Sequence, residues 1–446
     1  MRICSILAAG IALGVGPVAA APEFRNAIVI PGGAADHLPT ATPGANTNRL
    51  GGFLSDLWFD RRTNRYLALP DRGPGGGTIP YDARLQEFSV SVDHVTGAIS
   101  AFQLTRTTPL LIDGQPYNGL NPRRLGGDAA TLGRSLDPEG LVATRTGTLF
   151  VADEYGPSVL EFSPAGALLR SFPPPSNLLP RQADGQANYV DGRPAIVAGR
   201  QDNRGYEGLA ISPDGSKLYG ILQAPLVEEG GQSDGRRSRN VRIVEYDTAS
   251  GQSGRQWIYQ MDAIADLNAV TPGNPFSATN QGRSIGLSAI VALNATEFLV
   301  LERDGRGIGV DDPIGKVPVA SKRIYRIDIA GATDVADISL AGLDTLPPGV
   351  SAVRKALFLD IAVALKAAGQ PIPEKMEGLT IGPRLADGRY ALLIGTDNDY
   401  SVTQNGTGTQ FNVCADATRA EQVALEAACP AGLALIPTTL FSFQAD

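Results

Sequence analysis

The stretch that decides the fold is DPEGLVATRTGTLFVADEYG, residues 137–156. Two alternating apolar segments flank the turn RTGT, and this pattern predicts a β-hairpin. Glu139 stands at the start of the unit, and Asp153 and Glu154 stand at its end. Because the start of the first strand and the end of the second lie side by side in a hairpin, we expect these carboxylates to meet at one end of it.

The same pattern recurs along the chain. Each unit has an apolar alternating strand, a turn and a second apolar strand that ends in polar or acidic residues. In the third unit, SPDG places Pro213 second and Gly215 fourth, as a type I turn prefers. Further strands follow the hairpins, visible as SVLEFSPAG, RIVEYDTASG, RIYRIDIAG and TTLFSFQ. The five units are SDLWFDRRTNRYLALPDRG (55–73), EGLVATRTGTLFVADEYG (139–156), EGLAISPDGSKLYGILQAP (207–225), SAIVALNATEFLVLERDG (288–305) and EGLTIGPRLADGRYALLIGTDND (377–399).

This repetition predicts an all-β protein, a β-propeller with five clear blades. The units start about 70 to 90 residues apart, farther than the roughly 40 to 50 of simple propeller repeats, and long loops and a helical stretch at 353–369 account for the excess. A sixth, degenerate blade could lie between residues 75 and 135. The strand NAIVI (26–30) is expected to join the last blade beside TTLFSFQ and close the ring. Separate domains are the competing interpretation, but no linker-like stretch supports them, so residues 21–446 are predicted to form one domain.

The first twenty residues, MRICSILAAGIALGVGPVAA, combine an early arginine, an apolar run and small residues at the end. This pattern predicts a secretory signal peptide that is cleaved after Ala20. A membrane anchor is the alternative, but the run is short and rich in glycine. No other segment approaches a membrane span. We therefore expect an exported protein, periplasmic or secreted, with no membrane span.

Removal of the signal also removes Cys4 and leaves Cys414 and Cys429. An exported compartment permits a disulfide between them. The bridge would close a loop of about fifteen residues and contribute roughly 3 kcal/mol in the chain-entropy model. The intervening residues 415–428 resemble a short helix, so the bridge would staple a surface insertion. Two unpaired thiols are the alternative.

The net charge of −8 becomes −9 without Arg2. This charge argues against nucleic acid as the main partner, because a phosphate backbone needs a basic face. It is compatible with cation binding.

The innermost hairpins of a propeller gather around a central channel. If the first strand of each unit is the innermost, Glu139, Glu207 and Glu377 collect at one mouth of that channel. So many like charges need protons, paired arginines or a cation. Oxygen ligands favour Ca²⁺, with Mg²⁺ as the second choice, over zinc. The alternative is architectural: each glutamate would bind the backbone of a neighbouring blade.

The segments EGLVATRTGTLFVADEYGPSVLEFSPAG, NRGYEGLAISPDGSKLYGIL and EGLTIGPRLADGRYALLIGTDNDYS resemble the phytase-like family, named for an "esterase-like activity of phytase". The resemblance extends from about residue 45 to the end of the chain. It implies an exported bacterial propeller whose Glu and Asp residues form a phosphoesterase site. Ser55 and Ser288 replace glutamate in two units, so a ring of ligands would be incomplete. By motif position, the implied site and metal-binding residues are Glu139, Asp153, Glu154, Glu207, Glu377, Asp397 and Asp399.

Hydrolysis of a phosphate ester needs a cation to activate water and basic side chains to hold the ester. The candidate basic residues are Arg72 in PDRG, Arg204 in NRGYEG and Arg303 in LERDG. Each stands beside a repeated acidic position and could equally be the ion-pair partner of its neighbour. The residues expected to act in catalysis are Glu139, Glu207, Glu377, Arg72, Arg204 and Arg303.

These residues favour an exported, metal-dependent phosphoesterase that acts on a small phosphomono- or phosphodiester. A calcium-dependent lactonase or esterase is the alternative enzyme and would need a more apolar pocket. A propeller that binds a ligand without catalysis, with purely structural calcium, is the alternative of another class. A serine hydrolase has little support, because neither His37 nor His94 has a sequence neighbour that suggests acid–base catalysis.

Overall fold

The computed structural model describes residues 21–39, 47–126 and 128–446. The predicted signal peptide and Cys4 lie outside the described residues. Among those described, no helix has the length and apolar character needed to cross a membrane.

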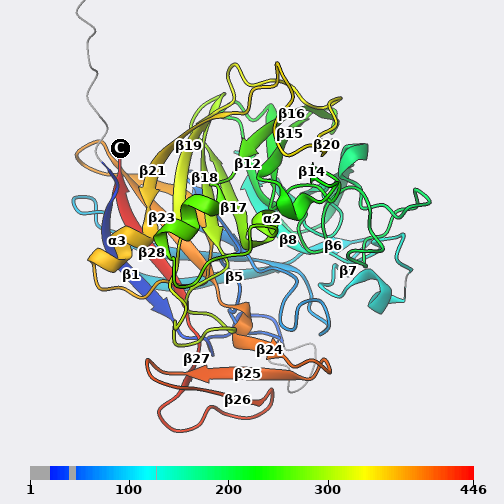
Figure 1. Cartoon of the computed structure of the whole chain (residues 1–446). Coiled ribbons are helices and arrows are strands. Elements are labelled where there is room, and N and C mark those ends of the chain that lie inside the picture. The colour runs from blue at the N-terminus through cyan, green and yellow to red at the C-terminus, as the bar shows by residue number, and fades with distance from the viewer. Residues whose placement is uncertain (1–20, 40–46, 127) are drawn as a thin grey trace, which may run out of the picture.

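Five four-stranded antiparallel sheets make up the main body of the described chain, and each predicted hairpin supplies two adjacent strands of one sheet (Figure 1). The first sheet consists of β2 (Asp56–Asp60), β3 (Arg65–Leu69), β4 (Arg84–Val92) and β5 (Ile99–Pro109). The second consists of β8 (Pro138–Ala143), β9 (Leu149–Asp153), β10 (Val159–Phe162) and β11 (Leu168–Phe172). The third consists of β12 (Tyr206–Ile211), β13 (Lys217–Leu222), β15 (Asn240–Asp247) and β16 (Ser253–Gln260). The fourth consists of β17 (Ile285–Ala292), β18 (Glu297–Asp304), β19 (Lys322–Asp328) and β21 (Arg354–Asp360). The fifth consists of β22 (Lys375–Arg384), β23 (Tyr390–Asp397), β28 (Thr438–Ala445) and β1 (Glu23–Ile30).

The connections carry short elements. The short strands are β6 (Leu111–Ile112), β7 (Gln115–Pro116), β14 (Gly230–Gly231) and β20 (Ala341–Gly342). The α-helices are α1 (Ile264–Val270), α2 (Gln281–Ser284) and α3 (Ile361–Ala367). The 3₁₀ turns are η1 (Pro122–Leu125), η2 (Ser176–Leu178), η3 (Gly235–Arg237) and η4 (Asp399–Ser401).

The first strands of the five hairpins pack against one another in chain order. β2 contacts β8, β8 contacts β12, β12 contacts β17, β17 contacts β22, and β22 contacts β2. The apolar core fills the spaces between neighbouring sheets, as where Leu69 of β3 and Leu141 of β8 share one cluster. These first strands therefore lie at the centre of the molecule.

The local strand structure explains why a Glu-Gly pair recurs in the first strands. In β8 and β12 the pairing with the next strand is interrupted between Pro138 and Gly140 and between Tyr206 and Gly208, so the intervening glutamate sits at a β-bulge. A bulge re-aims a side chain away from the regular alternation. A Cβ on Gly140 would lie 2.8 Å from the backbone nitrogen of Leu209 in the next sheet. The glycine thus allows two first strands to approach closely while the glutamate turns out of the sheet.

The fifth sheet confirms the expected pairing of the two chain ends. β1 pairs with β28, with Ile28 opposite Leu440. The segment that could have held a sixth blade instead supplies β4 and β5, which complete the first sheet, followed by the β6–β7 pair. The predicted helical stretch at 353–369 is half strand, because β21 extends the fourth sheet before α3 begins.

An additional small sheet lies at the edge of the molecule, below the main body in Figure 1. This insertion sheet contains β24 (Val402–Gln404), β25 (Gln410–Ala415), β26 (Ala420–Ala424) and β27 (Ala434–Leu435). The predicted disulfide between Cys414 and Cys429 is present in it. The helix expected between these cysteines is wrong: β26 pairs with β25, and this pairing overrides the local helix propensity.

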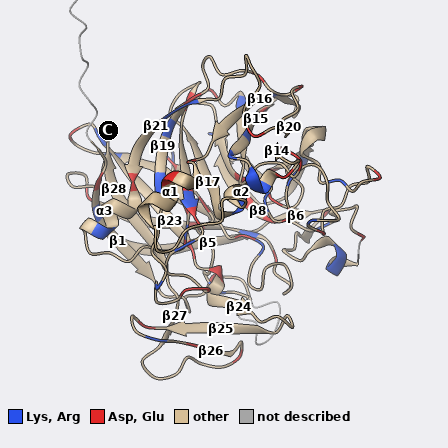
Figure 2. Ribbon diagram, viewed as in Figure 1, with Lys and Arg blue, Asp and Glu red and all other residues tan. Residues whose placement is uncertain are grey.

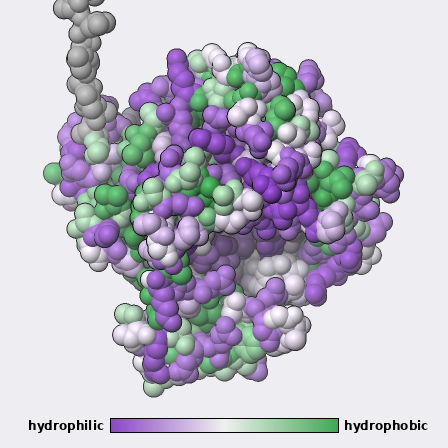
Figure 3. Space-filling model, in the orientation of Figure 1, coloured by the Kyte–Doolittle hydropathy of each residue, from purple (hydrophilic) through white to green (hydrophobic). Residues whose placement is uncertain are grey.

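Basic and acidic side chains are interspersed over the whole ribbon rather than segregated onto separate faces (Figure 2). In the face shown in Figure 3, hydrophilic residues border a hollow above the insertion sheet.

Candidate active site

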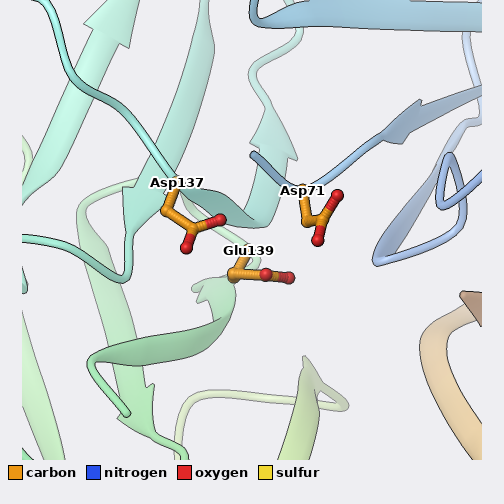
Figure 4. Close-up of side chains that lie close together, drawn as sticks. All are labelled: Asp71, Asp137 and Glu139. Carbon is orange, nitrogen blue, oxygen red and sulfur yellow. The ribbon is translucent and has the colours of Figure 1, made fainter. Parts of the chain in front are cut away.

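Seven carboxylates form a continuous row at the centre of the molecule, which we call the acidic arc. It falls into three overlapping groups, and in each the ligand oxygens lie within 4.8 Å of one another. Figure 4 shows one of these groups, in which Asp71 faces Asp137 and Glu139, two residues of a neighbouring chain segment. The second group is Asp71, Asp397 and Asp399, and the third is Glu139, Glu154 and Glu207.

The hairpins bring these residues together as their register predicts. Pro138, next to Glu139, pairs with Asp153, next to Glu154, so both glutamates lie at one end of the second sheet. In the fifth sheet Lys375 pairs with Asp397 at the corresponding end. The sheet ends meet because the first strands are in contact around the centre.

Two cationic side chains neutralise the aspartate side of the arc. Lys375 places its Nζ 3.0 Å from Asp397 Oδ2 and 2.5 Å from Asp399 Oδ1. Arg72 places Nη1 3.0 Å from Asp137 Oδ2, and its backbone N–H donates to Asp137 Oδ1 at 3.0 Å. Asp71 accepts the backbone N–H of Gly73 at 2.9 Å.

The glutamate side has no such counter-ion, and we call Glu139, Glu154 and Glu207 the glutamate triad. Within the part of the chain that the structure describes, the carboxylates of Glu139 and Glu154 take part in no ion pair. Glu207 Oε1 accepts a hydrogen bond from the Gln223 amide, whereas its buried Oε2 has no hydrogen-bond partner. All three residues are buried, and Glu207 is only 3% exposed.

Burial and mutual repulsion raise the pKa of several carboxyl groups in the arc. The pKa of Glu139 is raised well above its ordinary value by burial and then by Glu207 and Asp137. The pKa of Glu207 is raised in the same way by burial and then by Glu154 and Glu377. Burial also raises the pKa of Asp137 to about 7, although Arg72 acts in the opposite direction. A bound cation would relieve this repulsion.

Glu377 lies beside the arc and is already paired. It sits in the bulged part of β22 and forms an ion pair with Arg303, which also donates to Ser288 Oγ at 2.9 Å. Burial raises the pKa of Glu377 to about 7. Ser288 thus replaces the glutamate of the fourth unit with a hydroxyl that orients an arginine.

Asp153 belongs to none of the three oxygen groups found in the described residues. Its Oδ1 accepts the backbone N–H groups of Asp137 and Tyr155, and its Oδ2 accepts that of Gly156. These bonds hold the ends of the second sheet together, so we remove Asp153 from the candidate ligands.

The three predicted basic residues differ in whether they are paired with a carboxylate. Arg303 is paired with Glu377. Arg72 is paired with Asp137 and also donates to the side chain of Asn203. Arg204 donates one hydrogen bond, 3.4 Å long, to the backbone carbonyl of Arg283, and among the described residues it has no carboxylate at ion-pair distance.

A family model described as "Phytase-like: Esterase-like activity of phytase" matches residues 48–400. The chain belongs to the phytase-like family.

The phytase-like chain is also 28% identical over 444 residues to an "Uncharacterized secreted protein" of Arthroderma benhamiae, a match that covers 81% of this chain and 85% of that protein. Among solved structures, it is similar to virginiamycin B lyase from Staphylococcus aureus, with 10% identity over 91% of this chain and 83% of that chain and a TM-score of 0.32. The periplasmic gluconolactonase of Pseudomonas aeruginosa shows 12% identity over 92% of this chain and 99% of that chain, with a TM-score of 0.31.

Three residues of the candidate site are not among the residues predicted from the sequence. Asp71 and Asp137 were left out of the predicted ligands, although Asp71 ends the first hairpin and Asp137 stands two residues before Glu139. Asp71 follows from the repeat, whereas Asp137 does not, because Gly205 and Lys375 occupy the corresponding positions in the third and fifth units. Lys375 stands two residues before Glu377, and no pattern in the sequence marks it as the counter-ion of Asp397.

The architectural role considered for the glutamates is performed by other residues. Asp56 of β2 accepts the backbone N–H of Leu141 in β8 at 2.6 Å. Thr380 of β22 accepts that of Phe59 in β2 at 3.0 Å. These side chains join neighbouring first strands, which leaves the glutamate triad available for another role.

Proposed function

We propose that this phytase-like protein is an exported, metal-dependent ester hydrolase of the phosphoesterase type, built on a closed five-bladed propeller. Five four-stranded sheets, and a contact between β22 of the last and β2 of the first, support this proposed architecture. The disulfide and the secreted relative support export.

The observation that carries the proposal is the glutamate triad. Three buried carboxylates converge with no cationic partner at ion-pair distance among the described residues, and there Glu207 Oε2 also lacks a hydrogen-bond partner. A buried, unpaired carboxylate costs several kcal/mol unless it is neutralised. Oxygens up to 4.8 Å apart can share one ion at about 2.4 Å each, the distance that Ca²⁺ prefers, whereas Mg²⁺ needs about 2.1 Å. Oxygen donors within this limit can hold Ca²⁺, which is the ion that we propose for the site.

The residues around the triad supply the remaining functions. A bound divalent ion would polarise the ester and lower the pKa of a bound water. Glu139, Glu154 and Glu207 would fix the position of that ion, and Gln223 orients Glu207. Arg204, which acts electrostatically on Glu154 and Glu207, would stabilise negative charge on the ester oxygens. Arg72 and Lys375 keep the aspartate side of the arc neutral.

Glu207→Gln tests the proposal. The variant should lose calcium binding and hydrolysis of p-nitrophenyl phosphate or its bis-ester by at least about 100-fold, because a charged ligand is removed. Calorimetric calcium titration and the assay, each with and without EDTA, measure both effects. Glu421→Gln is the matched control, because Glu421 is an exposed residue of the insertion sheet paired with Arg419. Calcium content and turnover unchanged in Glu207→Gln would refute the site.

A calcium-dependent lactonase or esterase is the second candidate. It is favoured by one observation: Arg72 and Arg303 are already paired with carboxylates, which leaves fewer cations for a phosphate group. A cavity of about 550 Å³ with apolar residues such as Val29 and Leu435 lies beside the insertion sheet, but none of its lining residues belongs to the arc. A simple lactone in the same assay separates the two activities. Calcium binding without turnover of any of the three substrates would favour a non-catalytic binding protein.

A further inference from the structure

Asp202, Asn203 and Arg204 form a lip that precedes β12 and borders the glutamate triad. Each side chain of the lip is directed to a different neighbour. Asp202 pairs with Arg283 of α2, with Oδ1 3.6 Å from Nη1. Asn203, in a left-handed conformation with φ of 50°, accepts a hydrogen bond from Arg72. The lip is therefore fixed from both sides, and Arg204 is held between them.

Arg204 forms no ion pair and few hydrogen bonds with the described chain. An arginine has five N–H donors, and this one donates a single long hydrogen bond, to the Arg283 carbonyl. Burial and then repulsion from Arg283 lower the pKa of Arg204 to about 10. Arg303 adds further repulsion. The Arg204 guanidinium thus lies against the backbone of Arg283, whose own guanidinium pairs with Asp202 and donates to the Asp202 backbone carbonyl.

The surroundings leave room for Arg204 beside the triad. A Cβ on Gly286, at the start of β17, would lie 3.3 Å from Arg204 Nη1. The absence of a side chain there admits the guanidinium. Glu154 and Glu207 are its acidic neighbours, but neither approaches to ion-pair distance.

A purely neutralising role for Arg204 explains this geometry poorly. A residue that only offsets Glu154 and Glu207 would gain most by contacting them directly, as Lys375 contacts Asp397 and Asp399. Arg204 instead stays beside Arg283, where like charges repel. Because Arg283 is already paired with Asp202, it is the remaining N–H donors of Arg204 that gain a partner when an anion binds.

We propose that Arg204 and Arg283 form an oxyanion subsite at the lip, which binds an anionic phosphate or carboxylate group of the substrate next to the cation on the glutamate triad. The inference rests on the proposed function, and it restricts the substrate to esters that carry such an anion. A bidentate guanidinium contact suits the planar or tetrahedral oxygens of either group.

Titration of inorganic phosphate into the calcium-loaded protein tests the subsite. The phosphate and calcium concentrations are kept below those at which calcium phosphate precipitates. The wild-type protein should bind phosphate. Arg204→Gln and Arg283→Gln should each raise the dissociation constant for phosphate roughly tenfold or more, because a charge-assisted hydrogen bond is lost. Arg204→Gln should bind calcium at least as tightly as wild type, since a neighbouring positive charge is removed. A parallel titration of acetate shows whether the subsite accepts carboxylates as well as phosphate. Arg236→Gln is the control, because Arg236 is an exposed arginine near the lip whose guanidinium is already paired with Asp234.

The outcomes are distinguishable. Calcium-loaded wild type that binds neither anion, or Arg204→Gln that binds phosphate as tightly as wild type, would overturn the subsite while leaving the metal site intact. An equal loss of phosphate affinity in Arg236→Gln would assign phosphate binding to general surface charge, and this result would also overturn the proposed subsite. Failure of wild type to bind calcium would instead refute the proposed function. Partial recovery of phosphate binding in Arg204→Lys would support the subsite, because lysine keeps the charge but not the bidentate geometry.

Discussion

A single lysine pairs with two carboxylates on the aspartate side of the acidic arc. Lys375 approaches Asp397 and Asp399, and it also acts electrostatically on Asp71. Although burial lowers its pKa, the neighbouring aspartates raise the pKa of Lys375 well above its ordinary value, so the ammonium group stays charged. We infer that this ammonium takes the place of a cation among the three aspartates, which confines the metal to the glutamate triad.

Replacement of this lysine by glutamine should therefore expose the aspartates to one another. Lys375→Gln should lower the free energy of unfolding by up to about 3 kcal/mol in EDTA, because buried carboxylates lose their partner. Calcium should restore part of the loss by binding to the vacated aspartates. Urea denaturation at pH 7, with and without calcium, measures both effects. In the control Lys217→Gln, which breaks a more exposed pair with Asp247, the loss should stay below about 1 kcal/mol.

At the scale of the element, the Glu-Gly pair performs two tasks in each first strand where it occurs. The bulge turns the glutamate toward the centre, and the glycine lets the next sheet approach. A Cβ on Gly208 would lie 3.0 Å from Cα of Ala289, much as that on Gly140 would meet Leu209. The motif is therefore a packing device as well as a source of ligands.

Gly140→Ala should destabilise the fold by about 1–3 kcal/mol, because the added methyl group meets backbone atoms of the neighbouring first strand. The midpoint of urea unfolding provides the measurement. Gly273→Ala is the matched control, since no atom lies within 4 Å of the added Cβ, and it should be neutral or stabilising by up to about 1 kcal/mol. Equal stability of the two variants would contradict the packing role.

At the scale of the whole molecule, buried acids make the stability depend on pH. Burial raises the pKa of Asp137, Asp153 and Glu228 to about 7 each, compared with values near 4 in the unfolded chain. Between these limits the folded state binds more protons than the unfolded state, so the free energy of unfolding falls as the pH rises.

The metal-free protein should therefore show a Tm that declines from pH 5 to pH 7.5 when measured calorimetrically in EDTA. Each group contributes about 1.4 kcal/mol per pH unit at most within this window. Calcium should reduce the decline, because it competes with protons for the carboxylates and binds more tightly as the pH rises. A Tm that rises with pH in EDTA would show that the buried acids are ionised without cost.

Much of the fold could be predicted from the hairpin repeats. Alternating apolar residues around a turn define each hairpin locally, and the pairing of NAIVI with TTLFSFQ followed from the same pattern. The exceptions were residues 415–428 and 353–369, where helical composition gave way to pairing with a neighbouring strand. Pairing between distant segments can outweigh local propensity, and a single sequence does not reveal it.

The sequence by itself determined the hairpins, their acidic ends and the cysteine pair, because these depend on residues close together in the chain. Only the tertiary structure decided which carboxylates are neutralised: Lys375 and Arg72 satisfy the aspartate side, backbone N–H groups satisfy Asp153, and the glutamate triad is left without a cation. The physical reason is that charge interactions depend on the distance between side chains. In the arc, side chains from several sheets come within a few ångströms of one another.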